Sequence, residues 1–153
     1  MSKYATIYGY IGLASRITHR NFEVVNAHNL QQLQDLPDTD VFPYLSRDMF
    51  GLSEGRLVST FFSILHFGAS IKNLDHEDIP EFLPKFEGFL KRLVWIEAKM
   101  HLDIEIDGLY VYSWSALQHA IEVSRSSLTE TSPVTEWDFK ANENDAYFKI
   151  FSA

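Results

Sequence analysis

The chain has 153 residues, of which 46% are hydrophobic and 22% are charged, and a formal net charge of −8. This composition predicts one soluble globular domain over residues 1–153. There is no cysteine, which excludes disulfides, thiolate metal sites and cysteine nucleophiles. The acidic charge argues against nucleic acid as the main ligand, because phosphate binding needs a clustered basic surface. It favours a basic partner, although acidity that serves solubility alone explains the charge equally well.

The N-terminal run MSKYATIYGYIG lacks the basic region, apolar run and cleavage site of a signal peptide. No stretch approaches about 18 uninterrupted apolar residues, so we expect no membrane span. The lack of cysteine suits a reducing compartment. These features predict a cytoplasmic protein that does not bind membranes.

Residues 3–11 predict a first strand, because apolar and polar side chains alternate. One face would carry Ala5, Ile7 and Ile11, and the other Tyr4, Thr6, Tyr8 and Tyr10. Glycines at positions 9 and 12 indicate a bulge or a turn near its end.

A helix is expected over residues 22–36, with Asn21 as its N-cap and Pro37 after its end. Its apolar positions are Phe22, Val25, Leu30 and Leu33. Residues 37–56 mix turn formers with large apolar side chains, which predicts an ordered loop with a short helical turn.

Residues 57–72 alternate in the manner of a long strand, although the first half could instead be a helix. Asp78 is expected to cap a second helix that has Pro80 in its first turn. The apolar stripe of this helix comprises Phe82, Leu83, Phe86, Phe89, Leu90 and Leu93. From Val94 onward the period of the pattern changes to 2, which predicts another strand.

The run KMHLDIEIDGLYVYSW, residues 99–114, predicts a β-hairpin, because alternation leads into the turn dipeptide Asp107-Gly108. A two-residue turn would pair Ile106 with Leu109, Ile104 with Val111 and Leu102 with Ser113. In this register one face is apolar. The other face gathers His101, Asp103 and Glu105 beside Tyr110, Tyr112 and Trp114.

After the hairpin we expect a short helix over residues 115–128, a polar connection over 129–136, and two strands at 136–139 and 146–151 around a turn at 141–145. The whole order of elements predicts an α+β two-layer sandwich, with a mainly antiparallel sheet and the helices packed on one face.

No catalytic motif is recognisable: the sequence has no HExxH, no G-x-S-x-G and no phosphate-binding glycine loop. His76, Glu77 and Asp78 precede a helix, where capping explains them better than a metal site. His101, Asp103 and Glu105 suit a solvated polar face better than a metal or acid–base site. We therefore expect a protein that is not an enzyme and needs no cofactor or metal.

Aromatic rings mixed with carboxylates are typical of a surface that binds another macromolecule. The candidate partner-binding residues are Tyr8, Tyr10, His101, Asp103, Glu105, Tyr110, Tyr112 and Trp114. A competing interpretation is that the chain itself, or a dimer mate, covers these rings. The sequence is also compatible with a small-ligand or enzyme pocket near His66 and His101, and with a homo-oligomer whose sheet face is self-complementary.

The runs YATIYGYI, FPYLSRDMFG, HFGASIKNL and HLDIEIDGLYVYSW, with the helix that leads into the hairpin, resemble small bacterial immunity proteins of polymorphic or contact-dependent toxin systems. The resemblance is one of overall character and assigns no residue roles. It implies a cytoplasmic protein that neutralises a cognate toxin by tight binding. The partner would then be a toxin domain of basic character.

Overall fold

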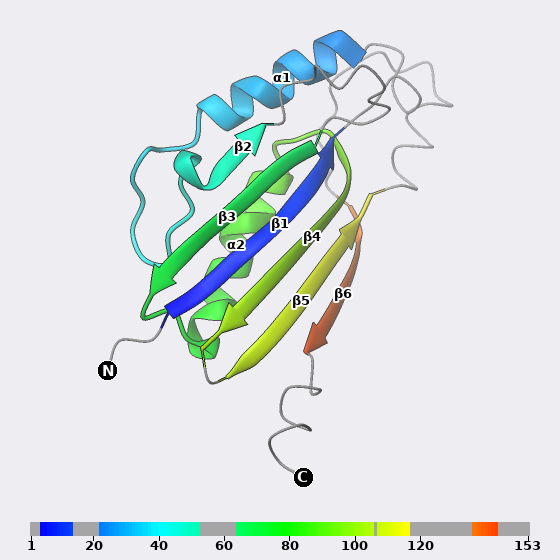
Figure 1. Ribbon diagram of the computed structural model, residues 1–153. Coiled ribbons are helices and arrows are strands. Elements are labelled where there is room, and N and C mark those ends of the chain that lie inside the picture. The colour runs from blue at the N-terminus through cyan, green and yellow to red at the C-terminus, as the bar shows by residue number, and fades with distance from the viewer. Residues whose placement is uncertain (1–3, 14–21, 53–63, 106, 117–135, 144–153) are drawn as a thin grey trace.

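The computed structural model describes residues 4–13, 22–52, 64–105, 107–116 and 136–143 (Figure 1). These residues form one antiparallel sheet with the strand order β2-β3-β1-β4-β5-β6, two α-helices and two short 3-10 helices. The strands are β1 Tyr4–Leu13, β2 Phe50–Leu52, β3 Ile64–Lys72, β4 Trp95–Ile104, β5 Gly108–Ser115 and β6 Asp138–Glu143. The helices are α1 Phe22–Gln34, α2 Ile79–Leu90, η1 Arg47–Met49 and η2 His76–Asp78. The predicted α+β fold, with helices packed on a mainly antiparallel sheet, is confirmed.

Strand β1 lies between β3 and β4 and is antiparallel to both. Strands β3 and β4 are therefore parallel to each other, and α2 makes the crossover that such a pair requires. Figure 1 shows α2 behind the sheet, with α1 across one end beside β2. One face of the sheet is thus covered by a helix, and we refer to it as the core face.

The core is built from the apolar stripe of α2 and the inward side chains of the strands. Phe82, Phe86 and Phe89 are buried as the helical spacing predicts. Ala5, Ile7 and Ile11 are buried on β1, and Met100, Leu102 and Ile104 on β4, as their alternation predicts. These assignments are confirmed because each depends only on the period of one segment.

Gly9 marks the closest approach of two backbones in the sheet. A Cβ atom at this position would lie 2.0 Å from the Lys99 carbonyl oxygen and 2.7 Å from the ring of Phe67. The strand continues regularly through Gly9, and its register shifts between Gly12 and Leu13. The predicted irregularity therefore occurs at the second glycine, and β1 ends two residues later than the predicted Ile11.

Helix α1 is attached to the rest of the fold by a buried amide. Asn29 Nδ2 donates to the Val94 carbonyl oxygen at 2.9 Å, and the Val94 N–H donates to Asn29 Oδ1 at 2.8 Å. Val25 is buried as predicted, but Leu30 is 42% exposed, so its place in the apolar stripe was predicted wrongly. The helix turns Asn29 inward because its side chain satisfies two backbone groups where β4 begins.

Other boundaries differ from the predictions. Strand β2 lies in the segment expected to be a loop, although the short helical turn expected there is present as η1. Strand β6 runs through residues 141–143, which were expected to form a turn. Predictions for residue 21, for residues 57–63, for the helix beyond residue 116 and for the strand at 146–151 lie outside the described residues.

The hairpin is present, but its predicted register is wrong. Ile104 pairs with Gly108, Leu102 with Tyr110, Met100 with Tyr112 and Ala98 with Trp114. Asp107 donates its N–H to the Ile104 carbonyl oxygen at 3.1 Å, and Gly108 has a positive φ of 116°. Asp107-Gly108 therefore ends the turn and does not form its centre, and the predicted pairing of Ile106 lies outside the described residues.

Leu102 thus faces residue 110 and not residue 113, a shift of three positions. Because successive side chains in a strand point to opposite faces, an odd shift exchanges the two faces of β5 relative to β4. The rings at positions 110, 112 and 114 consequently share the core face with Met100 and Leu102.

Candidate functional site

Three of the predicted partner-binding residues are on the wrong side of the sheet for that role. Tyr112 and Trp114 are only 3% and 1% exposed. Trp114 Nε1 donates to Glu87 Oε2 of α2 at 3.0 Å, and its ring lies 4.9 Å from that of Phe86. Tyr110 is half-buried against the same core. The prediction that these three rings project outward is wrong, because it followed from the incorrect register.

Four other predicted residues, Tyr8, Tyr10, His101 and Asp103, do lie together on the opposite side of the sheet, which we call the open face. Glu105 follows the end of β4 and is exposed. The open face comprises Tyr4, Thr6, Tyr8 and Tyr10 of β1; His66, Gly68, Ser70 and Lys72 of β3; Glu97, Lys99, His101 and Asp103 of β4; Leu109, Val111, Ser113 and Ser115 of β5; and Asp138 and Lys140 of β6.

The centre of the open face is an aromatic pair. Tyr8 and His101 are cross-strand partners whose rings stack at 4.8 Å with an interplanar angle of 4°. On its other side Tyr8 faces Gly68, which has no side chain to cover the ring. Tyr8 is 44% exposed and Tyr4, further along the same strand, is 48% exposed. Two neighbouring strands thus present flat rings to solvent.

His101 contributes a neutral ring. Burial, and secondarily the charge of Lys99, lowers its pKa, and its Nδ1 atom is buried without a hydrogen-bond partner in the described structure. A histidine whose pKa is lowered stays uncharged at neutral pH. The Tyr8–His101 pair is therefore an uncharged aromatic stack on a surface that also carries charged side chains.

The charges around this stack are mixed. Asp103 is exposed opposite Thr6, but Lys72, Lys99 and Lys140 share the same face. Burial, followed by the charge of Glu97 and a hydrogen bond to it, raises the pKa of Tyr10. The open face is therefore less uniformly acidic than the sequence predicts.

Glu105 has a structural contact that the sequence does not reveal. Its N–H donates to the Tyr4 carbonyl oxygen at 3.1 Å, and its carboxylate accepts from the Tyr4 N–H at 3.2 Å. The side chain thus holds the start of β1 against the hairpin.

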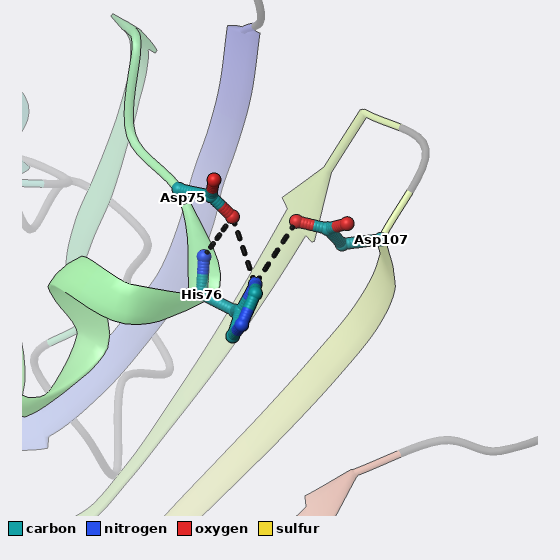
Figure 2. A group of neighbouring side chains, drawn as sticks. All are labelled: Asp75, His76 and Asp107. Carbon is teal, nitrogen blue, oxygen red and sulfur yellow. Dashed lines mark hydrogen bonds and ion pairs between the residues drawn. The ribbon is translucent and has the colours of Figure 1, made fainter.

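Asp75, His76 and Asp107 form a cluster whose ligand atoms lie within 4.8 Å of one another, close enough for a metal ion. Figure 2 shows the His76 ring between the two carboxylates. His76 Nδ1 lies 2.8 Å from Asp75 Oδ1 and 3.4 Å from Asp107 Oδ2. Hydrogen bonds to Asp107 and then Asp75 raise the pKa of His76. These bonds account for the grouping, and we assign no metal to it.

The segment before α2 does contain a cap, but the prediction that Asp78 caps α2 with its side chain is wrong. Asp75 accepts from the His76 N–H, and Asp78 accepts from the Asp75 N–H at 2.9 Å. Asp78 occupies the N-cap position of α2 but makes no side-chain bond to that helix. The capping interaction therefore belongs to the 3-10 helix η2.

The two histidines near which a pocket was considered, His66 and His101, lie on different strands of the open face. His66 lies opposite Tyr10 on β3 and His101 opposite Tyr8 on β4, so β1 separates them. The described residues line a cavity of about 40 Å³ beside α1 and a groove of about 320 Å³ beside β3, and neither includes these histidines.

Sequence reasoning missed the segment beside that groove. Val41, Phe42 and Tyr44 are exposed apolar side chains in the connection between α1 and η1. The signal was present, because the run PDTDVFPY places large apolar residues among prolines and aspartates. Whether these side chains are buried or exposed depends on the position of this connection in the tertiary structure.

No protein-family model matches this sequence, and no curated protein or solved structure matches it significantly. Among the described residues, no helix is long and apolar enough to cross a membrane. The surfaces of the molecule are therefore the basis for assigning it a function.

Proposed function

We propose that this chain is a non-enzymatic binding protein that holds another protein against the open face of its sheet. The observation that carries this proposal is the stack of Tyr8, which is 44% exposed, on the half-buried ring of His101 at the centre of that face. Exposed aromatic surface rimmed by polar groups is a feature of protein contact sites. Tyr4, Tyr8 and His101 are the anchors in this proposal, and they replace the buried Tyr112 and Trp114.

The geometry favours binding over catalysis. The rings stand on paired central strands, β1 and β4, so little side-chain freedom remains to be lost when a partner covers them. On the neighbouring strands the stack is flanked by Gly68 and Val111. Aromatic anchors on the face of a sheet suit a macromolecular partner better than a small molecule, which usually binds in a concave pocket.

The partner that we propose is basic. The net charge of −8 would steer a cationic protein toward this chain and raise its association rate. Asp103 and Glu97 supply carboxylates near the stack, while the three lysines of the face would set orientation by repelling wrong placements.

Together with the resemblance to immunity proteins, these features support a specific role. We propose that the chain neutralises a cognate bacterial toxin domain in the cytoplasm by covering it with the open face. A homodimer through the same face is the competing use of this surface, and the molecular mass in dilute solution separates the two.

The test begins with the reading frames beside this gene: a small toxic domain encoded there is co-expressed with this chain and binding is then measured with the purified proteins, and the lack of any such domain would count against the immunity role. The chain should rescue growth, and the double variant Tyr8→Ala/His101→Ala should lose rescue and weaken binding by at least about a hundredfold, as hot-spot residues do. Val24→Ala on α1, which truncates an exposed apolar side chain away from the sheet face, is the control.

Each variant should first be shown to unfold at an unchanged denaturant concentration. If the folded double variant binds the toxin as tightly as the control does, the open face is not the binding surface. If the unchanged chain neither rescues growth nor binds the toxin domain, the immunity role is wrong.

A further inference from the structure

A second surface lies at the outer edge of β3. In the described sheet β2 pairs with Leu65, His66 and Phe67, so the segment Gly68–Lys72 extends beyond it. On the other side this segment pairs fully with β1. Because alternate residues of an antiparallel strand point their N–H and C=O groups to opposite sides, part of this backbone faces outward. The segment is an edge that a further strand can extend.

The connection between α1 and η1 runs beside this edge but does not pair with it (Figure 1). Between the two lies the groove of about 320 Å³. One wall is formed by Ala69, Ser70 and Ile71 of β3. The opposite wall comprises Asp38, Thr39, Asp40, Tyr44, Ser46, Asp48 and Met49.

The opposite wall is held in place by Lys85 of α2. Lys85 Nζ donates to Asp40 Oδ2 at 3.0 Å, to the Val41 carbonyl oxygen at 2.9 Å and to the Pro43 carbonyl oxygen at 2.8 Å. Arg47 adds a bond to the Gln34 carbonyl oxygen at 3.1 Å and an ion pair with Asp38. The groove is therefore formed before any ligand enters, which lowers the entropy lost on binding.

The charged residues that line the groove are all carboxylates: Asp38, Asp40 and Asp48. Arg47 and Lys85 partly neutralise the first two. Asp48 accepts from the Ser46 hydroxyl and has no ion pair with any residue in the part of the chain that the structure describes. Although burial opposes it, hydrogen bonds from the Leu45 N–H and then Lys85 lower the pKa of Asp40, so this carboxylate stays ionised. A ligand in the groove meets negative charge.

The rim of the groove adds apolar contact area. Phe42 and Tyr44 are exposed and meet edge to face with their ring centroids 5.6 Å apart. Val41 is exposed beside them. The groove thus combines an open strand edge, carboxylates and aromatic rings, which are the three features that an extended basic peptide segment would use.

We infer that the groove binds an extended, basic segment of a protein partner, which adds to the sheet as a strand beside Gly68–Lys72 in line with β2. Backbone hydrogen bonds to β3 fix the segment, lysine or arginine side chains reach Asp38 and Asp48, and an apolar side chain contacts Tyr44. This site uses different residues from the open-face anchors. The result of its test therefore does not depend on whether the proposed function is correct.

The test uses a short soluble peptide of alternating lysine and valine, titrated into the isotope-labelled full chain and followed by backbone amide shifts. We expect shifts at Gly68–Lys72 and at residues 38–48. A peptide of alternating glutamate and valine should not bind. The lysine–valine peptide with N-methylated backbone amides should bind at least tenfold more weakly, because it cannot donate to the strand edge.

Variants separate charge at the groove from overall charge. Asp38→Asn/Asp48→Asn should weaken the lysine–valine peptide about tenfold. Glu23→Gln/Glu81→Gln removes the same charge from two exposed helical positions and should change affinity less than about twofold. Tyr8→Ala should have no effect, which separates this site from the open face.

Any of four outcomes would overturn the inference, and the first three concern how the peptide binds. They are equal weakening by the two double variants, equal binding of the N-methylated peptide, and shifts confined to strands other than β3. An absence of any binding by the lysine–valine peptide would also overturn it.

Discussion

The two faces of the sheet both carry aromatic rings on adjacent strands, yet the rings have opposite environments. On the core face Trp114 is enclosed by α2 and bonds to Glu87. On the open face Tyr8 stacks on His101 and remains 44% exposed. Residue type does not distinguish these positions, because both are amphipathic aromatics. Register therefore decides whether such a ring lies in the core or on the exposed surface.

We expect the largest difference when the free energy of unfolding is compared between one variant of the core face and one of the open face. Trp114→Ala should lower the free energy of unfolding by about 3–5 kcal/mol, because it leaves a cavity and removes the donor to Glu87. Tyr8→Ala should cost less than about 1 kcal/mol, as surface changes usually do. Urea denaturation of both variants measures this. A larger loss for Tyr8→Ala would mean that the faces are assigned the wrong way round.

The next effect concerns backbone spacing on the two faces. Gly9→Ala should destabilise the fold by about 2 kcal/mol or more, because its Cβ would overlap the Lys99 carbonyl oxygen. Gly68→Ala, the cross-strand neighbour of Tyr8, meets its nearest atom at an ordinary 3.6 Å and should change stability by less than about 0.5 kcal/mol. Thermal unfolding of the two variants under one set of conditions gives the difference. Equal losses would contradict the close approach at Gly9.

The smallest effect is a pH dependence of opposite sign at two histidines. Burial lowers the folded-state pKa of His101 below its ordinary 6.5, so its contribution to stability is full above that pH and declines as the pH falls. Asp107 and Asp75 raise the pKa of His76 above 6.5. Its contribution is full below pH 6.5 and is lost as the pH rises through the folded value.

Unfolding free energies measured between about pH 5 and about pH 8 test this contrast. His101→Gln should reduce the loss of stability toward low pH. His76→Gln should reduce the gain there, by a smaller amount because the site is exposed. If the two variants shift the pH profile in the same direction, one of the two environments is wrongly assigned.

The sequence predicted those parts of the fold that depend on a local period. The alternation in β1 located the outward Tyr4, Tyr8 and Tyr10, and the helical spacing of α2 located Phe82, Phe86 and Phe89. Each of these patterns indicates which side of its segment is buried, because an amphipathic segment buries only its apolar side.

The candidate site was predicted only in part, because it depends on how segments meet. To predict the faces of the hairpin, one needs the register of β5 against β4. A turn that ends at Gly108 shifts this register by an odd number of residues from the predicted one. To predict the groove, one needs the contact between Lys85 and Asp40, which lies 45 positions earlier in the chain. No local pattern encodes either distance.

From the sequence alone one could derive the fold class, the lack of cysteine, the acidic charge and the buried sides of β1, β4 and α2, but not the buried side of β5. Tertiary structure decided which aromatic rings are buried and where the open edge of β3 faces carboxylates. The physical reason is that periodicity fixes which side of one element is buried, whereas register and loop placement arise only from contacts between elements.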